Sequence, residues 1–581
     1  MSEPVSIPGV QVHLDLREPH THRVLVTLSA SAPAEHFVVS LPGWTPGSYL
    51  IRDYVRQLEG LSAEQNGRVL ALTRLSPSRW RVEGASPHEP VSIRYGVMAT
   101  ELSVRTCHFD QDHGFFALAA VVLELEGQRW QPHQLTCQLP AQWQAFTPLA
   151  AAADGGWLAR DYDQLIDSPL EVGAHTLHQF QVRGVPHRWV TWAGDARDAS
   201  WFHERYPSFF EDVRRVCEAC CDLLAESAPA SRDYLFVLHL LDDGYGGLEH
   251  DDSCVLVYGR RNLEAEHGYR KLLQLIAHEY FHQWNVRRLT PAELRPIDYQ
   301  QASVVPTLWF AEGVTSYVDQ WLPLRAGLSE PEDYLHDLGE DLSRYLLSPG
   351  RFVQSLQTSS EEAWVKLYKP DAYSGNSQIS YYLKGAVIAL CADLHLRQNG
   401  SSLERVLQGL WRSHGAVGRG YQQQDLLAAF EAACAGLGSI LERWLTSVDD
   451  PDIDGYLLSV GLALEPEMAA HPWSGAVLKV QPNGLQVQRI WRQSPAERAG
   501  LMVGDELIGL DATRLTLVEQ WERLLSAGAS HELLISRRSQ LRRLRLEPGA
   551  PAVKRYRLVT LATARPEQEA ARAAWLRPAG R

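Results

Sequence analysis

Cysteine is scarce in this chain and shows no pattern of regularly spaced pairs. The 581 residues include only 8 cysteines, too few for the disulfide framework of a small secreted protein. Reduced thiols in a cytoplasmic protein are the simplest interpretation, so we expect a cytoplasmic location. Cys217 and Cys220 have the C-x-x-C spacing of redox and metal sites. They lie in an amphipathic helical pattern without a second pair, and we expect them to be structural.

Positive charge and long apolar runs are also lacking. The formal net charge is −15 at pH 7, which argues against nucleic acid or an anionic membrane as the main partner. No run of about 18 apolar residues occurs, so we expect no membrane-spanning helix. The first residues, MSEPVSIP, lack the basic and apolar regions of a secretion signal. The composition, 45% hydrophobic and 22% charged, is typical of a globular protein with large cores.

The pattern along the chain predicts a multidomain α+β protein. Residues 1–185 contain short alternating apolar runs separated by Gly, Pro, Ser and Asn, which predicts an all-β domain. Residues 186–450 mostly have helical periodicity. The exceptions are two apolar, strand-like runs, Tyr234–Leu241 and Cys254–Tyr258, on either side of a Gly-rich loop. The middle domain is therefore predicted to be mainly helical with a small sheet.

The helices expected in the middle domain follow from runs of helical period and length. They are Phe209–Ala225, Tyr269–Val286, Leu308–Leu322, Pro331–Leu347, Ile379–Gln398 and Gln422–Ala433. After an acidic linker at 449–455, residues 451–550 alternate short strands with two short helices, which predicts a separate domain. Residues 551–581 are rich in Ala, Arg and Pro, and we expect a loosely ordered tail.

The strongest chemical signal is the H-E-x-x-H motif within LLQLIAHEYFHQWNV, residues 272–286. His278 and His282 are four residues apart, so on a helix they face the same way and can share one zinc ion. Glu279 is rotated off the ligand axis and can take a proton from a water on the metal. Such a motif arises by accident in roughly 5% of chains with this histidine content. The apolar flanking residues predict burial, where these polar groups need a partner such as a metal.

A catalytic zinc usually has three protein ligands and one open position. Glu312, in the apolar segment LWFAEGVTSY on a second predicted helix, is the best candidate for the third ligand; the alternative is a helix-capping or solvent-exposed acid. Asp319 follows two turns later on the same face. It either accepts a hydrogen bond from a ligand histidine or is a simple surface residue. We expect one zinc ion per chain.

These residues resemble a known group of enzymes. H-E-x-x-H followed by an E-G ligand on a second helix resembles the gluzincin peptidases, which have a thermolysin-like catalytic domain. Gly246-Gly247-Leu248-Glu249-His250 resembles the G-x-M-E-N loop of aminopeptidase N and its relatives, with His250 in place of Asn. Tyr382-Leu383-Lys384-Gly385 resembles their Y-x-K-G motif. The gap between His282 and Glu312, however, is longer than in those enzymes.

The longer gap, G-G-L-E-H, and the segment WTPGSYLIRD at residues 44–53 resemble instead the glycyl aminopeptidase family. Its members are zinc peptidases with an N-terminal β domain, a thermolysin-like domain and a C-terminal PDZ domain. The resemblance implies that Glu249, with Gly246 and Gly247, binds the substrate's free α-amine, and that Tyr382 stabilises the oxyanion. Tyr381 remains a rival for the latter role, and Glu249 in a sheet-edge ion pair is the alternative to the former.

The C-terminal domain has its own signature. The segment SPAERAGLMVGDELI, residues 494–508, resembles the core of bacterial PDZ domains. PDZ domains add a peptide as a strand to their sheet and hold its C-terminal carboxylate on backbone N–H groups. We expect the carboxylate-binding loop at Val460, Gly461, Leu462, Ala463 and Leu464. The alternative is a domain that only packs on the catalytic domain or builds an oligomer.

The combined signals predict a zinc-dependent aminopeptidase that acts on peptides with a free N-terminus. A preference for N-terminal Gly or Ala is implied by the resemblance alone. Two alternatives remain open. One is a zinc endopeptidase to which the PDZ domain recruits substrates, and the other is a non-catalytic PDZ adaptor with a peptidase-like fold.

Overall fold

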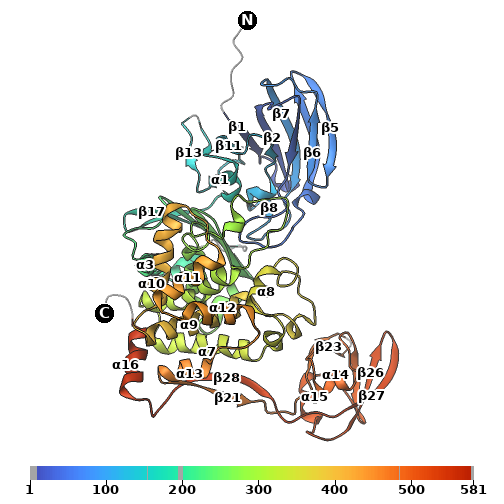
Figure 1. Cartoon of the computed structure of the whole chain (residues 1–581). Coiled ribbons are helices and arrows are strands. Elements are labelled where there is room, and N and C mark those ends of the chain that lie inside the picture. Colours follow the sequence, from blue (N-terminus) through green and yellow to red (C-terminus); the bar gives the residue numbers. More distant parts are fainter. Residues whose placement is uncertain (1–8, 154, 194–199, 483, 578–581) are drawn as a thin grey trace. The chain divides into compact units, whose positions relative to one another are not determined.

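The computed structural model describes residues 9–153, 155–193, 200–482 and 484–577 (Figure 1). The chain forms two compact units. The first unit contains the chain up to Ser303 together with Arg325–Leu328 and Leu410–Tyr421, and the second contains the rest.

The first unit begins with an all-β region, coloured blue to cyan in Figure 1. Its larger sheet has eleven strands in the order β10-β3-β6-β5-β4-β7-β2-β1-β11-β14-β13. Burial alternates along the strands, as in β1, where Val10, Val12 and Leu14 point into the core. The strands are β1 (Val10–Asp15), β2 (Arg23–Ser31), β3 (His36–Ser40), β4 (Leu58–Gln65), β5 (Arg68–Ser76), β6 (Arg79–Glu83), β7 (Pro90–Met98), β10 (Glu124–Leu125), β11 (His133–Gln138), β13 (Ala150–Ala151) and β14 (Trp157–Ala159).

A smaller, four-stranded sheet follows in the same unit, in the order β12-β15-β9-β8. Its strands are β8 (Cys107–Phe109), β9 (His113–Phe116), β12 (Gln144–Phe146) and β15 (Leu170–Gly173), and helix α1 (Tyr162–Asp167) precedes β15. The predicted all-β domain is therefore confirmed in class.

The third sheet of the first unit has the order β16-β17-β18-β20-β19, in which β17, β18 and β20 run parallel. Every residue of β18 except the last is buried, as expected for a parallel strand covered on both faces. The elements are β16 (Leu177–Val182), β17 (Val185–Ala193), β18 (Tyr234–Leu241), β19 (Tyr245–Glu249), β20 (Ser253–Gly259), α2 (Ser200–Arg205), α3 (Phe209–Leu224), α4 (Arg260–Glu264) and α5 (Gly268–Phe281).

Two sequence expectations change in this sheet. The β16–β17 hairpin pairs with β18, so the boundary predicted at residue 185 falls at the start of a strand of the third sheet. The Gly-rich segment expected as a loop is the edge strand β19, antiparallel to β20. Its glycines and turn-like composition concealed the strand.

The second unit is helical at its centre. Its residue Glu312 lies in a π-helix, η5 (Trp309–Val314), which continues as α6 (Thr315–Arg325). The other helices are α7 (Pro331–Leu346), α8 (Leu356–Glu361), α9 (Tyr381–Gln398), α11 (Gln423–Ala433), α12 (Leu437–Thr446) and α13 (Ile453–Ser459), while α10 (Leu403–Ser413) is divided between the two units. All six helices predicted from the sequence are confirmed, with ends shifted by a few residues.

One described segment, Ser374–Gln398, is long and apolar enough to cross a membrane by length and composition alone. However, 72% of its apolar window is buried inside the protein. It is therefore packed like the core helix of a globular domain.

The C-terminal part of the second unit contains a separate sheet with the order β22-β23-β24-β26-β27, and β25 pairs with β24. Leu485, Leu507, Trp521 and Ile535 belong to its own hydrophobic core. We call residues 476–546 the C-terminal module. Its elements are β22 (Ala476–Gln481), β23 (Gly484–Ile490), β24 (Glu506–Leu510), β25 (Thr513–Arg514), β26 (His531–Arg537), β27 (Gln540–Leu546), α14 (Pro495–Arg498) and α15 (Val518–Leu524).

The expected carboxylate-binding loop is wrongly placed. Val460 and Gly461 end α13, and Leu462, Ala463 and Leu464 begin β21 (Leu462–Met468), which pairs with β28 (Val553–Thr560) in a two-stranded ribbon outside the module's sheet. Arg572 donates hydrogen bonds to the carbonyls of Val460 (3.2 Å) and Gly461 (3.1 Å). This segment is therefore already paired within the protein.

The expectation of a loosely ordered tail is also wrong. Residues 553–575 form β28 and α16 (Pro566–Trp575), and the Trp575 ring is fully buried. Its indole N–H donates to the Tyr317 hydroxyl on α6, at 3.1 Å. The Ala- and Arg-rich composition concealed a helix that begins with Pro566 in its first turn and is held by one aromatic anchor.

This anchor gives a test of the fold. Trp575→Ala is expected to destabilise the docking of α16 by about 3–5 kcal/mol, because it leaves a large cavity. Amide hydrogen exchange, measured by mass spectrometry, should become at least about 100-fold faster in α16, which corresponds to about 2.8 kcal/mol at 1.4 kcal/mol per factor of ten. Trp130→Ala is the matched control, since the Trp130 side chain is 62% exposed. Unchanged exchange in α16 would contradict the docked arrangement.

Candidate metal centre and substrate site

The H-E-x-x-H motif lies at the end of α5, as the spacing predicted. The rings of His278 and His282 are 4.6 Å apart between centroids and perpendicular. The helix is shorter than expected and ends at Phe281, so that His282 is its C-terminal cap. His282 Nδ1 lies 2.5 Å from the carbonyl oxygen of Asn285, which can only accept a hydrogen bond. Nδ1 therefore holds the proton, and Nε2 is left with a lone pair for a metal.

Two carboxylates converge on this histidine. The ligand atoms of Glu249, Glu279 and His282 all lie within 4.8 Å of one another. All three side chains are buried, Glu249 with 4% exposure. Glu249 comes from the end of β19 and Glu279 from α5, so the strand and the helix bring residues 30 positions apart into one polar cluster.

Glycines permit this close approach. A Cβ atom on Gly247 of β19 would lie 2.2 Å from Glu279 Oε1. On the other side, a Cβ atom on Gly47 would lie 2.5 Å from Glu249 Oε2, and Gly47 has a φ of +80°. Both positions exclude a larger residue unless a carboxylate moves. Gly247 therefore has a spatial role beside the general-base candidate, whereas no clash is found at Gly246.

Glu249 has an incomplete set of hydrogen bonds. Its Oε1 atom is buried and has no hydrogen-bond partner among the described residues. It borders a cavity of about 290 Å³ that is also lined by Gly47, Tyr49, Arg287 and Tyr299. A buried carboxylate oxygen without a partner is costly, so the site favours a ligand that brings a hydrogen-bond donor or a positive charge.

The His250 side chain belongs to a network of hydrogen bonds and ion pairs. Its Nδ1 lies 3.2 Å from Asp167 Oδ1, and Asp167 also forms an ion pair with Arg287 at 2.8 Å. The nearby carboxylates, Asp167 first and then Asp251 and Glu249, raise the pKa of Arg287 against the effect of burial. Arg287 is therefore a fixed cation near Glu249, which the sequence analysis did not identify.

The second unit holds the other predicted site residues. Glu312, in η5, is 1% exposed. Helix α9 packs closely on η5, because a Cβ atom on Gly313 would lie 2.6 Å from the Cα of Gly385. Tyr382 lies in the first turn of α9, and burial, followed by the negative charge of Glu312, raises its pKa well above the usual value. Glu312 and Tyr382 are thus electrostatic neighbours.

The two rival tyrosines differ in accessibility. Tyr381 is completely buried, whereas Tyr382 is half-buried. Their rings stack at 4.7 Å, and the Tyr382 hydroxyl lies 3.3 Å from that of Tyr368. Asp319 lies on α6, half-buried. Its hydrogen bond to a ligand histidine remains a prediction.

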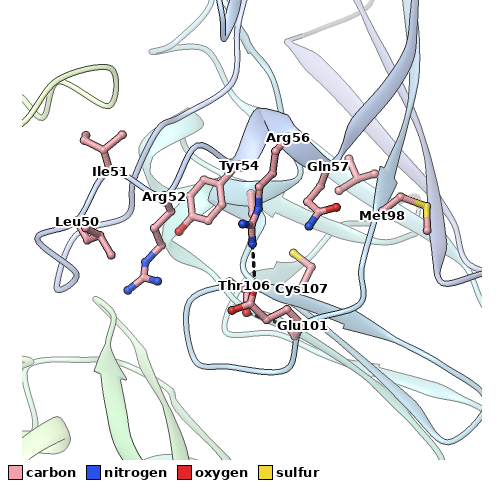
Figure 2. A pocket seen from close by; sticks show the side chains of 12 residues that line it. Leu50, Ile51, Arg52, Tyr54, Arg56, Gln57, Met98, Glu101, Thr106 and Cys107 are labelled. Atoms are coloured by element: carbon pink, nitrogen blue, oxygen red, sulfur yellow. Dashed lines mark hydrogen bonds and ion pairs between the residues drawn. The ribbon is translucent and has the colours of Figure 1, made fainter. Parts of the chain in front are cut away.

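A second cavity of about 220 Å³ lies beside the segment 50–57 (Figure 2). Figure 2 shows Arg56 reaching Glu101, and this ion pair measures 3.0 Å with both side chains more than half exposed. Such an exposed pair contributes little to stability. On the other side of the segment, the Arg52 guanidinium donates to Ser48 Oγ at 2.8 Å and so holds the loop that contains Gly47. This cavity offers no cluster of metal ligands.

Comparison with known proteins agrees with this architecture. The family model "Peptidase M61 N-terminal domain" matches residues 11–174, which end just before the β16–β17 hairpin. The model "M61 glycyl aminopeptidase" matches residues 271–388, which include the H-E-x-x-H motif, Glu312 and Tyr382. No curated protein sequence matches the chain significantly.

Solved structures are also similar. An aminopeptidase N family protein from Idiomarina loihiensis is 30% identical, covers 98% of this chain and 100% of its own, and has a TM-score of 0.89. An M1 zinc metallopeptidase from Deinococcus radiodurans is 15% identical over 78% of this chain and 96% of its own, with a TM-score of 0.47. From the two family models and the Idiomarina structure, we conclude that the chain belongs to the M61 glycyl aminopeptidase family of peptidases.

Proposed function

We propose that the protein is a zinc-dependent aminopeptidase that releases N-terminal residues from peptides. The observation that supports this most directly is the buried Glu249 carboxylate, whose Oε1 lacks a hydrogen-bond partner among the described residues and which clusters with Glu279 and His282. A substrate ammonium group would supply the hydrogen-bond donors that Glu249 Oε1 lacks. Because Glu249 lies beside Glu279 and His282, an amine held there would place the first peptide bond at the metal.

The donor set fits zinc. His278, His282 and Glu312 would hold one zinc ion per chain, because two imidazoles and one carboxylate are a common catalytic set. The tautomer of His282 fixed by the Asn285 carbonyl supports this, since it leaves Nε2 available as a ligand. When bound, zinc would polarise the scissile carbonyl and lower the pKa of a water molecule.

The chain's own residues would then have separate roles in the reaction. Glu279 accepts the proton of the attacking water and delivers it to the leaving amine. Glu249 holds the α-ammonium group, and Tyr382 donates a hydrogen bond to the developing oxyanion. A tyrosine hydroxyl is protonated at neutral pH and can donate, and burial and Glu312 hold the pKa of Tyr382 still higher. Asp319 would orient a ligand histidine.

A preference for N-terminal Gly or Ala is proposed from family membership. The physiological location is proposed to be the cytoplasm, on the basis of the sparse, unpaired cysteines.

The C-terminal module is proposed to be a PDZ domain that binds peptide C-termini. Strand β22 lies at one edge of its sheet, so its outer side is available for an added peptide strand. The segment 460–464 lies outside the sheet of the C-terminal module. We therefore place the carboxylate-binding loop among the residues that lead into β22 instead. Recruitment through this edge also supports the alternative function, an endopeptidase.

Removal of the Glu249 charge tests the exopeptidase function. Glu249→Gln should lower kcat/KM for alanine p-nitroanilide by about 10- to 100-fold, because a charge-assisted bond of about 1.5–3 kcal/mol is lost in a desolvated site. N-acetylation of a peptide substrate should abolish cleavage of its first bond. Glu266→Gln is the control, as its side chain is 89% exposed. Equal cleavage of acetylated and free peptides would instead indicate an endopeptidase.

Glu279→Gln separates metal binding from chemistry. We expect kcat to fall by about 10²–10⁴-fold, as for loss of a general base, with bound zinc unchanged by elemental analysis. His282→Ala should remove activity together with the zinc ion held by His278, His282 and Glu312. If wild-type protein shows no chelator-sensitive release from any aminoacyl p-nitroanilide, the adaptor alternative is favoured.

The tyrosine pair can be distinguished by kinetics. Tyr382→Phe should lower kcat by about 10²–10³-fold with little change in KM, as expected for an oxyanion donor. Tyr381→Phe is the matched control and should have a small effect on kcat. The reverse result would assign the role to Tyr381.

A further inference from the structure

A second cluster of metal-ligating side chains lies in the first unit, separate from the residues of the proposed active site. It consists of His113 on β9, Glu171 on β15, His175 in the loop after β15, and His239 on β18. The residues His113, Glu171 and His239 are fully buried, and the His175 side chain is 6% exposed. We call these four residues the Glu171 cluster.

The imidazoles converge on one carboxylate. His113 Nδ1 lies 2.9 Å from Glu171 Oε1, and His175 Nε2 lies 2.8 Å from the same oxygen. The ligand atoms of these three residues all lie within 4.8 Å of one another. His239 Nε2 lies 3.0 Å from the other carboxylate oxygen, Oε2.

The distances are close to those of a metal site. Ligands at about 2.0–2.1 Å from a tetrahedral zinc ion are about 3.3 Å from each other. The observed separations of 2.8 and 2.9 Å therefore need to open by only about half an ångström, which small rotations of the two rings supply. The third pair, His113 with His175, is already separated by less than 4.8 Å.

The cluster combines one carboxylate with imidazole rings. In the described part of the chain, every ion-pair partner of Glu171 is an imidazole, and no Arg or Lys approaches it. A buried carboxylate oxygen that two imidazole nitrogens approach is a donor set that suits a divalent cation such as Zn²⁺.

The ligands are also held in place. His113 stacks on Trp192 with ring centroids 3.8 Å apart. His175 lies against Gly173, where a Cβ atom would meet its Nε2 at 2.4 Å. Since His239 contacts Oε2 whereas the other two rings contact Oε1, it helps to fix the orientation of Glu171, as outer partners of metal ligands do. His175 lies in a loop and is slightly exposed, so a metal ion would reach the site from its side.

We propose that the Glu171 cluster is a second metal site that takes Zn²⁺ through His113 Nδ1, Glu171 Oε1 and His175 Nε2, with His239 hydrogen-bonded to Oε2 and the fourth position left to water. The site joins the four-stranded sheet to β18 of the third sheet. Around it, Phe115 of β9 packs in one apolar cluster with Val190 and Val237 of the third sheet. The ion would therefore stabilise an existing junction between the two sheets.

The test is the zinc content of the full-length protein. Protein loaded with Zn²⁺ and desalted should contain two zinc ions per chain by elemental mass spectrometry. His175→Ala should contain one, and the double variant His278→Ala/His282→Ala should also contain one. His178→Ala is the matched control, because His178 is a half-buried histidine three residues further on that packs against Phe210 at 4.6 Å, and it should retain two.

The outcomes separate this proposal from the proposed enzyme function. One zinc in wild-type protein, lost in the His278/His282 double variant but retained in His175→Ala, would overturn the second site and leave the active site intact. One zinc lost only in His175→Ala would support the Glu171 cluster and contradict the catalytic metal.

A second measurement does not depend on the folding of a cluster variant. In the His278→Ala/His282→Ala background, added Zn²⁺ should raise the Tm by several degrees, since a metal that binds only the folded state stabilises it. No shift, together with one or no zinc in the wild-type protein, would mean that the imidazoles only donate hydrogen bonds to Glu171.

Discussion

The structure depends most on the close approach of strand β19 to helix α5. An edge strand and a helix do not normally bring a backbone atom within contact of a buried carboxylate. Here Gly247 removes the side chain that would occupy the position of Glu279, and Glu249 then extends from the same strand beside His282. Glu249, Glu279 and His282 are themselves buried, and a low-dielectric surrounding strengthens each electrostatic contact among them.

The packing is equally close on the other side of Glu249. The loop that contains Gly47 comes from the N-terminal β region, about 200 residues earlier in the chain, and reaches the carboxylate closely. The Arg52–Ser48 hydrogen bonds stabilise this loop locally. The N-terminal region therefore contributes directly to the surroundings of Glu249, in addition to its own sheets. Arg287, tied to Asp167, adds a fixed positive charge on the same cavity.

The sequence predicted those parts of the site that depend on local spacing. The i, i+4 histidines, Glu279 between them, and the apolar faces of α3, α5, α7 and α9 follow from helical periodicity alone. Contacts between distant segments were not predictable in this way: nothing near Gly47, His113 or His175 indicates which carboxylate each will meet. The strand nature of β19 was concealed by its glycines.

At the C-terminal end, composition was misleading. A Gly-Leu-rich segment at 460–464 resembled a carboxylate-binding loop, yet it pairs with a strand about 100 residues later.

The Trp575 anchor has a consequence for synthesis on the ribosome. Its partner Tyr317 lies 258 residues earlier, on the helix that continues from the one with Glu312. At a synthesis rate of about 5–20 residues per second, Trp575 is added to the chain roughly 13–52 s after Tyr317. During that interval the newly made segment exposes an apolar surface, which gives chaperones a defined period in which to bind it.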